Sequence, residues 1–426
     1  MDFINAEDFA RKLDQQDPLH KLRDAFHFPQ VNGKDVIYFT GNSLGLQPRS
    51  AQRFVDEIMK DWRELAVEGH FYADKPWWDY HERLVPSLAR IVGAREREVT
   101  VMNTLTVNLH LLMVSFYRPQ GGRFKILCEE KAFPSDQYML QSQLRFHGYD
   151  PAEALIEVRK RPGEHHWRTE DILEAIDANA GELALLLMGG VNYYNGQVLD
   201  MEEITKAAKG AGAMVGWDLA HAAGNVYLAL HDWNVDFAAW CSYKYMNSGP
   251  GNAAGAFIHE KHLTDTHIPR FEGWWGTKKE TRFLMQPEFD PIDSADAWQL
   301  SNAPVLALAP YLASLELFDE VGMEALIAKR DRIVSYLEFV LREIDKEVES
   351  TFEIITPEQA RGCQLSVFLH GEGRPLFDYL MQNGVITDWR EPNVIRLAPA
   401  PFYCSYSDMY HFGQILKKGI LEKATN

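Results

Sequence analysis

Between residues 124 and 260, short apolar runs alternate with amphipathic stretches, and this alternation limits the possible folds more than any other feature of the chain. The run at 184–188 is nearly continuous in apolar residues, as expected of a strand covered on both faces. Strands that alternate with helices are joined by right-handed crossovers, which places them in one mainly parallel sheet. We therefore predict an α/β fold with helices on both faces of the sheet. The predicted strands are 124–129, 184–188, 213–218, 236–241 and 254–260.

The pattern changes near Pro304, where long helical periodicities over about 305–347 precede short strands and helices. This change predicts a smaller α+β domain at the C-terminal end, and 426 residues exceed what one ordinary core accommodates. We predict an N-terminal segment over 1–40 that packs with the small domain, a large domain over 41–303 and a small domain over 304–426. The small domain should contain strands near 352–355, 364–369, 385–389 and 394–397, with helices near 374–383 and 407–421.

The composition excludes several kinds of function. Sixty-one acidic residues against 43 basic ones give a formal net charge of −18, which argues against non-specific binding to nucleic acid or to an anionic membrane. The chain contains no run of 18 apolar residues, and its first 26 residues lack the apolar core of a signal peptide, so a cytoplasmic protein without a membrane span is expected. None of the four cysteines has C-x-x-C spacing, so no metal site is expected.

One acid and one lysine stand where an enzyme active site is expected. Asp218 ends the predicted strand 213–218, at the carboxyl edge where α/β sheets bind ligands. Lys244 follows 26 residues later in a run of small and aromatic residues. This pair suits pyridoxal phosphate, because the lysine can form a Schiff base while the acid holds the protonated ring nitrogen. Taken singly, each residue has a plainer explanation: Lys244 could be a lysine that ends a strand at the sheet edge, and Asp218 could be a helix N-cap.

Other residues could complete such a site. Thr104, Leu105 and Thr106 precede a predicted helix, whose exposed N–H groups could bind a phosphate. Arg396 ends a short apolar strand and could bind the carboxylate of an amino-acid substrate. Around the ring, Phe133 could stack, Asp136 could support the nitrogen, and His221 could reach the phenolic oxygen; Ser135 is explained equally well as a helix cap.

Several segments together resemble the kynureninase family. They are TGNSLG (40–45), LTVNLHLLM (105–113), KAFPSD (131–136), GWDLAHAAGN (216–225), HDWNVDFAAWCSYKYMNSGPG (231–251), GAFIHEKH (255–262), GWWG (273–276) and IRLAPAPFY (395–403). The resemblance spans about residues 35–415. It implies a homodimeric fold-type-I pyridoxal-phosphate enzyme that hydrolyses the Cβ–Cγ bond of kynurenine or 3-hydroxykynurenine, releasing anthranilate or its 3-hydroxy form and alanine. Such enzymes serve tryptophan degradation and NAD biosynthesis.

The resemblance also implies residue roles. Lys244, Tyr243 and Asp218 are expected to be catalytic, and Trp274 and Asn302 are expected to act across a dimer interface. Cofactor contacts are implied for Leu105, Thr106, Phe133, Ser135, Asp136, Asp218, His221, Tyr243, Lys244, Trp274 and Asn302. Substrate contacts are implied for Ser43, His70, Asn302 and Arg396.

Three questions stay open at this point. Gly189 stands where the resemblance leads us to expect a small hydroxyl residue touching the cofactor. His70 and Asn302 resemble the animal-type enzymes, so we expect both kynurenines to be accepted, with 3-hydroxykynurenine preferred. Another fold-type-I enzyme, such as a cysteine desulfurase or an aminotransferase, is the alternative. A desulfurase needs a cysteine on a mobile loop, but neither Cys363 nor Cys404 lies in a glycine- or serine-rich one.

Overall fold

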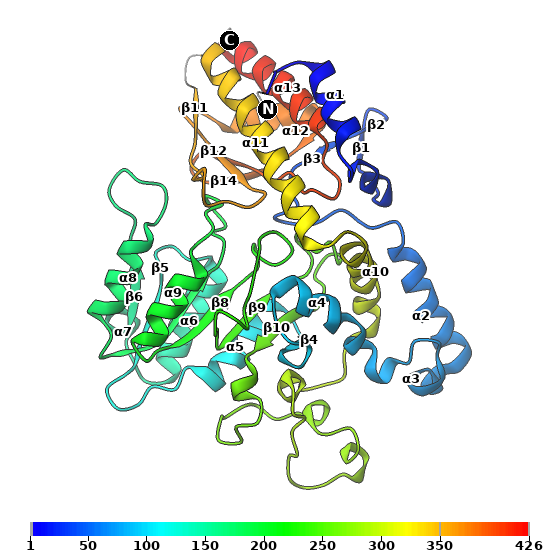
Figure 1. The fold of residues 1–426 in the computed structure, drawn as a ribbon, viewed down its shortest axis with the longest axis vertical. Helices are drawn as coiled ribbons and strands as arrows, with labels where there is room; N and C mark the ends of the chain where they lie inside the picture. The colour runs from blue at the N-terminus through cyan, green and yellow to red at the C-terminus, as the bar shows by residue number, and fades with distance from the viewer. Residues whose placement is uncertain (1–2, 349–350, 425–426) are drawn as a thin grey trace.

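The computed structural model describes residues 3–348 and 351–424, which form two bodies (Figure 1). The larger body surrounds a central sheet. The smaller one contains α1 (Glu7–Gln16) and α13 (Tyr406–Ala424), which pack together although they come from opposite ends of the chain.

The central sheet has seven strands in the order β4-β10-β9-β8-β7-β5-β6. β10 runs antiparallel to both neighbours, and every other neighbouring pair is parallel, which confirms the predicted mainly parallel sheet. Because parallel strands end at the same edge, the last residues of β5, β7 and β8 lie side by side there. The strands are β4 (Val99–Met102), β5 (Lys125–Glu129), β6 (Leu155–Val158), β7 (Leu183–Gly189), β8 (Met214–Asp218), β9 (Phe237–Trp240) and β10 (Ala254–Ile258).

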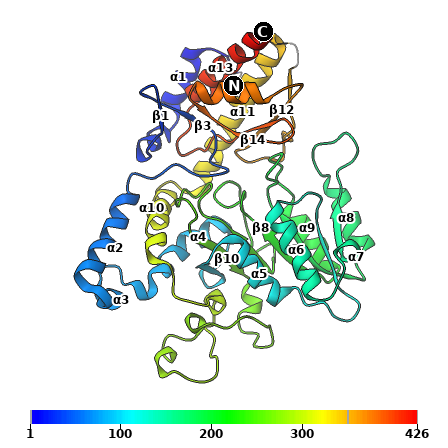
Figure 2. The ribbon, with the colours of Figure 1, turned by 180° about the vertical axis from the view of Figure 1, so that it is seen from behind.

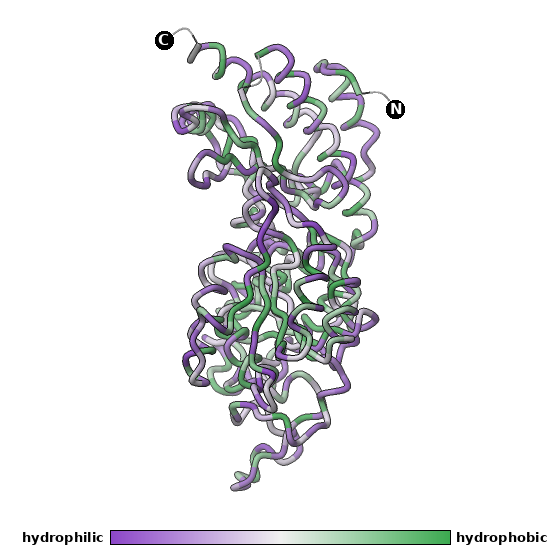
Figure 3. The backbone as a smooth tube through the Cα atoms, turned by 90° about the vertical axis from the view of Figure 1, so that its left-hand side faces the viewer, coloured by the Kyte–Doolittle hydropathy of each residue, from purple (hydrophilic) through white to green (hydrophobic). Residues whose placement is uncertain are grey.

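Both faces of this sheet are covered by helices. Alternate strand residues enter two separate clusters: Leu127 and Leu186 pack with α4, α8, α9 and α10, whereas Ile126 and Leu185 pack with α5 and α6. Figure 3 shows the resulting hydrophobic interior of the larger body. Coverage on both faces explains why these strands are apolar throughout. The helices are α4 (Val85–Val92), α5 (Leu105–Phe116), α6 (Pro134–Phe146), α8 (Thr169–Ala178), α9 (Met201–Gly210) and α10 (Val305–Val321).

The smaller body is an antiparallel sheet in the order β11-β12-β15-β14, with helices packed against it (Figure 2). β3 (Ile37–Tyr38), from near the N-terminus, pairs in parallel with β13 (Val385–Ile386). α10 packs on α2 (Ala51–Leu65) of the larger body. The predicted division into an N-terminal segment, a large domain and a small domain that begins at residue 304 stays a prediction. The other elements of the smaller body are β11 (Phe352–Ile354), β12 (Leu365–Leu369), β14 (Asp388–Arg390), β15 (Val394–Leu397), α11 (Met323–Glu347) and α12 (Arg374–Gln382).

Two predicted helices are divided in the structure. The periodicity over 5–26 predicts one helix, but α1 ends at Gln16 and a 3₁₀ helix, η1 (His20–Ala25), follows Pro18. Proline lacks the N–H that a continuous helix requires. The periodicity over 77–92 also predicts one helix, but it divides into η3 (Trp77–Leu84) and α4, with the non-helical residue Asp79 inside η3. The remaining short elements are β1 (Gln30–Val31), β2 (Lys34–Asp35), η2 (Ala66–Glu68), α3 (Gly69–Tyr72), η4 (Glu96–Glu98), α7 (Pro151–Ala154), η5 (Glu260–His262), η6 (Trp274–Gly276), η7 (Arg282–Leu284) and η8 (Ala295–Trp298).

Candidate active site

A cavity of about 540 Å³ lies at the carboxyl edge of the parallel strands, with residues of both bodies in its wall. β8 contributes Asp218 from the larger body, and β15 contributes Arg396 from the smaller one. Most residues singled out from the sequence meet here. Those that line the cavity are Ser43, Leu105, Thr106, Phe133, Ser135, Asp136, Asp218, His221, Tyr243, Lys244 and Arg396.

Lys244 lies in the loop between β9 and β10, and its Nζ is 2.9 Å from Nε2 of His221. Burial and the charge of Lys244 hold the pKa of His221 well below its ordinary value, so the imidazole is neutral. A neutral Nε2 accepts the hydrogen bond from the lysine, which places the histidine proton on Nδ1. That atom is buried and has no hydrogen-bond partner among the described residues.

Two carboxyl groups share the floor of the cavity. Asp218 is the last residue of β8, and its Oδ1 accepts a hydrogen bond from the Ala220 backbone N–H at 2.7 Å. Asp136 lies in the first turn of α6. Burial and then the charge of Asp218 raise the pKa of Asp136 well above its ordinary value, and burial also raises the pKa of Asp218. Asp136 therefore carries a proton and donates it in a hydrogen bond to Asp218, which is left as the carboxylate.

The N-terminus of α5 opens into the same cavity. Thr104 is the N-cap, yet its side chain makes no capping hydrogen bond. The first N–H groups of a helix have no partner within the helix, and here a side-chain cap does not occupy them. Such free N–H groups can bind a phosphate group, and Thr104, Leu105 and Thr106 all line the cavity.

Two aromatic rings flank the lysine. The ring of Phe133 is 40% exposed, and its centroid lies 6.0 Å from Nζ of Lys244, which leaves a face open to the cavity. Tyr243 is half-buried, and burial raises the pKa of its phenol, so the hydroxyl stays protonated. Phe133 can stack on a flat ring, and Tyr243 can donate a proton.

Arg396 is only 1% exposed. Its guanidinium donates to the Tyr193 backbone carbonyl at 2.6 Å and to Oδ2 of Asp388 at 2.5 Å. Ser43 donates to the same oxygen of Asp388 at 2.5 Å. Nε of Arg396 is buried with no partner among the described residues, so one donor remains for a ligand carboxylate.

The structure does not bring three of the predicted residues into this cavity. His70 and Asn302 line a second cavity of about 500 Å³ together with Trp62 and Trp77. Trp274 is 45% exposed, and its Nε1 donates to the Arg282 backbone carbonyl at 2.9 Å. Within one chain, these side chains and the Lys244 cavity are separate. Their roles stay predictions that depend on a second chain.

Sequence reasoning missed several residues of the cavity wall. Glu129 ends β5 just as Asp218 ends β8, and this shared position at a strand end is the signal that could have identified it. The other lining residues that were not named for this purpose are Asn42, Val191, Tyr193, Ala220, Gly251 and Arg390.

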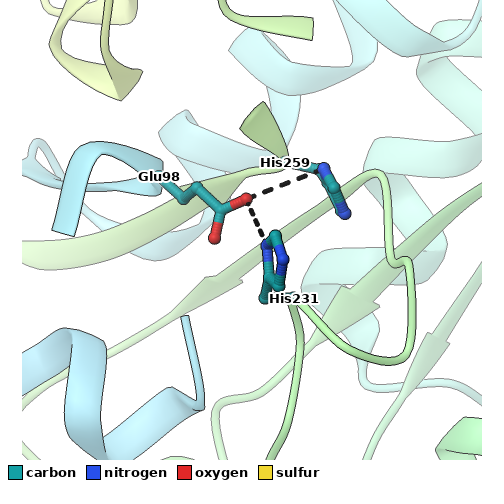
Figure 4. Close-up of side chains that lie close together, drawn as sticks. All are labelled: Glu98, His231 and His259. Atoms are coloured by element: carbon teal, nitrogen blue, oxygen red, sulfur yellow. Dashed lines mark hydrogen bonds and ion pairs between the residues drawn. The ribbon is translucent and has the colours of Figure 1, made fainter. Parts of the chain in front are cut away.

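A cluster of Glu98, His231 and His259 has the composition of a metal site (Figure 4). Oε1 of Glu98 accepts from Nδ1 of His231 at 2.9 Å and from the Glu260 backbone N–H at 2.8 Å. Nδ1 of His259 accepts from the Lys261 backbone N–H at 3.2 Å. Because Glu98 and His259 already accept backbone hydrogen bonds with these atoms, and His231 donates to Glu98, we interpret the cluster as a cap on the turn after β10.

The Lys244 cavity meets the requirements of pyridoxal phosphate. It contains an amine for covalent attachment, a helix N-terminus for the phosphate, and the buried carboxylate of Asp218, which Asp136 supports. The protonated ring nitrogen would pair with that carboxylate. The fold and the site define a pyridoxal-phosphate-dependent enzyme of fold type I.

Comparisons with known proteins identify the family within this class. A model of the kynureninase C-terminal domain matches residues 330–416. The chain is 72% identical to the kynureninase of Christiangramia forsetii over 425 residues, covering 99% of this chain and 100% of the relative. It is 70% identical to that of Flavobacterium johnsoniae over the same coverage, and 54% identical to that of Myxococcus xanthus over 97% of each chain. The chain belongs to the kynureninase family, and it is a hydrolase that acts on kynurenine.

Solved structures show the same fold at low identity. The chain superposes on a cysteine desulfurase from Thermococcus onnurineus with a TM-score of 0.74 at 17% identity, covering 91% of this chain and 95% of that one. A cysteine desulfurase from Escherichia coli gives 0.74 at 14% identity over 95% and 98%. Across the described residues, no helix is both long and apolar enough to cross a bilayer.

Proposed function

We propose that the Lys244 cavity is the site where kynurenine is hydrolysed, and that its residues divide the work between holding the cofactor, moving protons and binding the substrate. The observation that carries the proposal is the convergence of Lys244, the Asp136–Asp218 pair and Arg396 on one cavity. When bound there, pyridoxal phosphate supplies an electron sink for negative charge that develops on the substrate carbons.

Lys244 has two roles in this proposal. Its amine would hold the cofactor covalently in the resting enzyme, and the free amine would take the Cα proton of the substrate as a general base. The neutral His221 beside it, at 2.9 Å, accepts a hydrogen bond from Nζ without adding positive charge. This contact orients the lysine toward the cavity.

Asp218 would hold the ring nitrogen in its protonated form through a charged hydrogen bond, and the hydrogen bond from Asp136 keeps Asp218 in place. The protonated phenol of Tyr243 is the proton donor to the alanine fragment after the Cβ–Cγ bond breaks. Water is consumed in the same reaction, when it adds to the side-chain carbonyl of the substrate.

The substrate carboxylate binds Arg396. The unpartnered Nε supports this role, because a buried guanidinium donor without an acceptor is costly until a ligand fills it. Tyr193 and Asp388 accept from the two terminal nitrogens of the guanidinium, which leaves the Nε–H for the substrate. Ser43 contacts both Arg396 and Asp388, at 3.2 Å and 2.5 Å, and so lies beside the bound substrate.

The enzyme is proposed to be a homodimer in which His70, Trp274 and Asn302 reach the cavity of the partner chain. Large apolar side chains are exposed in this region, including Trp62 at 57% and Tyr72 at 73%. An exposed apolar surface of this kind is typical of a subunit interface. Its remaining members are Phe71, Phe283, Leu284 and Met285.

Shared sites can be tested by mixing two inactive variants, Lys244→Ala and Asn302→Ala. Hybrid dimers would contain one site free of both substitutions, so about a quarter of the sites should recover activity after subunit exchange. A mixture as inactive as its components would contradict sharing. Sedimentation of the wild-type protein as a monomer would contradict the dimer itself.

His70 and Asn302 would then contact the aromatic end of the substrate, and we propose that the enzyme accepts both kynurenines and prefers 3-hydroxykynurenine. Polar groups in a pocket discriminate strongly against a substrate that lacks the matching hydroxyl. The ratio of kcat/KM for the two substrates tests this, and a strong preference for kynurenine would contradict it.

A desulfurase activity is disfavoured by the cysteines. All four are buried and free, and burial raises the pKa of Cys363 to about 12, so none presents a reactive thiolate. Free thiols suit the reducing cytoplasm, where we propose that the enzyme works. Supplying the cofactor-loaded protein with kynurenine and with cysteine in parallel separates the two activities. Anthranilate and alanine should form in equal amounts, whereas release of sulfide from cysteine would favour the alternative.

A further inference from the structure

Glu129 is a buried acid in the cavity wall that the proposed chemistry does not use. It is the last residue of β5, and the last residues of β7 and β8 are Gly189 and Asp218. β7 lies between β5 and β8, and Gly189 pairs with Asp218 in the parallel register. Glu129 and Asp218 therefore approach the cavity floor from either side of Gly189.

The carboxyl group of Glu129 lies over the backbone of Gly189. The Gly189 N–H donates to both of its oxygens, at 3.2 Å and 3.3 Å. A Cβ atom built on Gly189 would lie 3.1 Å from Oε1 of Glu129, closer than ordinary packing permits. The glycine thus leaves the space in which the carboxyl group sits, and a side chain at 189 would force that group to shift by a few tenths of an ångström.

The surroundings of Glu129 disfavour its charge. Burial raises the pKa of Glu129 to about 7, and the nearby Asp218 adds to the effect. Lys160, whose charge acts in the opposite direction, forms its ion pair with Glu130 at 3.6 Å. The other charged or titratable groups that line the cavity are Asp136, Asp218, His221, Tyr243, Lys244, Arg390 and Arg396.

We propose that Glu129 is a third acid directed at the cofactor ring, that it works in its neutral form, and that Gly189 is required to leave room for it. The proposal rests on the placement of pyridoxal phosphate in this cavity. Asp218 already supplies one anion for the single cation of the ring. The remaining polar groups of the cofactor, its phenolic oxygen and its phosphate, are anionic. A neutral carboxyl group can donate a hydrogen bond to an anion, whereas an ionised Glu129 would repel it.

The affinity of the apoprotein for pyridoxal phosphate between pH 6.5 and 8.5 tests this. If only neutral Glu129 permits tight binding, its ionisation should raise the Kd by up to about tenfold per pH unit above pH 7. Glu129→Gln cannot ionise and should retain tight binding at pH 6.5 while losing this part of the pH dependence. Glu130→Gln, the neighbouring substitution, should behave as the wild type. Ionisation of the cofactor itself is common to all three proteins and cancels in the comparison.

Gly189→Ala provides a second variant with the carboxyl group intact. Its Cβ should displace Glu129 and raise the Kd several-fold at pH 6.5, whereas Gly210→Ala, with nothing within 4 Å of its added Cβ, should not. Thermal unfolding of each apoprotein checks that the variants are folded. The inference fails if Glu129→Gln keeps the wild-type pH dependence or binds poorly at pH 6.5, or if Gly189→Ala binds as the wild type. None of these outcomes affects the assignment of Lys244. That assignment is tested separately by the loss of the cofactor absorbance in Lys244→Ala.

Discussion

Nζ of Lys244 and Nε2 of His221 are 2.9 Å apart, and the histidine is the neutral member of the pair. A second cation at this distance would oppose the charged lysine, so the low pKa of the buried imidazole is what allows the contact. The pair holds the amine where the cofactor must be attached.

Replacing Lys244 by alanine should abolish the visible absorbance that arises when the lysine is joined to pyridoxal phosphate. No other described lysine lines the cavity, so no neighbour can substitute for it. The absorption spectrum of the purified, cofactor-loaded variant checks this. Lys12→Ala, at an exposed position far along the chain, should keep the band. Survival of the band in the Lys244 variant would show that a different amine is used.

Asp218→Asn should lower kcat by roughly 10²–10³-fold, because an amide cannot stabilise the protonated ring nitrogen as a carboxylate does. Asp136→Asn is the matched control, because it makes the same substitution at the other member of the carboxyl pair. Asp136 acts as the protonated donor to Asp218, and the NH₂ group of asparagine can still donate. Steady-state kinetics of both variants should therefore show a large loss for the first and a small one for the second. Equal losses would contradict the assignment of the proton to Asp136.

Arg396→Lys should raise KM for the amino-acid substrate by an amount equivalent to about 2–5 kcal/mol, because a buried charged contact is lost. Lysine keeps the positive charge but lacks the Nε–H that the guanidinium leaves for a carboxylate. Arg374→Lys, on an exposed face of α12, should leave KM unchanged. A normal KM in the Arg396 variant would mean that the substrate carboxylate binds elsewhere, with Arg390 the next residue to test.

Asp236 provides a stability prediction away from the active site. Burial alone would raise the pKa of this carboxyl, but the hydrogen bond from His262 and the charges of Lys209 and Lys261 outweigh burial and lower it. Its folded-state pKa lies below the unfolded-state value, so its contribution is full above the unfolded-state pKa and disappears as the pH falls through the folded-state pKa.

Asp236→Asn should therefore reduce the free energy of unfolding at pH 7 by about 3–5 kcal/mol, because it removes the buried anion that pairs with the half-buried Lys209 and with Lys261. Urea-induced unfolding measures the loss, which should shrink as the pH is lowered toward the folded-state pKa. Asp232→Asn, four residues earlier and exposed, is the control and should be neutral. A loss independent of pH would show that packing, rather than charge, explains the effect.

The sheet and most of the cavity could be predicted from the sequence because both depend on local patterns. The ends of apolar runs predict where strands end, and parallel strands bring those ends together, which is why Asp218 and Lys244 were found. Glu129 was missed because Glu129 and Glu130 together look like an ordinary surface pair. Only the pairing of β5 with β7 in the sheet shows that Glu129 is buried over Gly189.

The residues that sequence reasoning could not place are those whose position depends on tertiary or quaternary contacts. His70 and Asn302 come together in a second cavity, although 232 positions separate them in the numbering. No local pattern predicts which chain's cofactor they approach. The N-terminal helix ends before Pro18 although the apolar periodicity continues, because the residue before a proline disfavours the helical conformation and Asp17 is extended.

The central claim is that the Lys244 cavity cleaves kynurenine, and product formation by two proteins tests it most directly. Wild-type protein and Lys244→Ala, both supplied with pyridoxal phosphate, are incubated with kynurenine and with 3-hydroxykynurenine, and the aromatic acid and alanine are quantified. The wild type should release both products in equal amounts, and the variant should release neither at a measurable rate. Turnover by the Lys244 variant, or no turnover of either substrate by the wild type, would contradict the account.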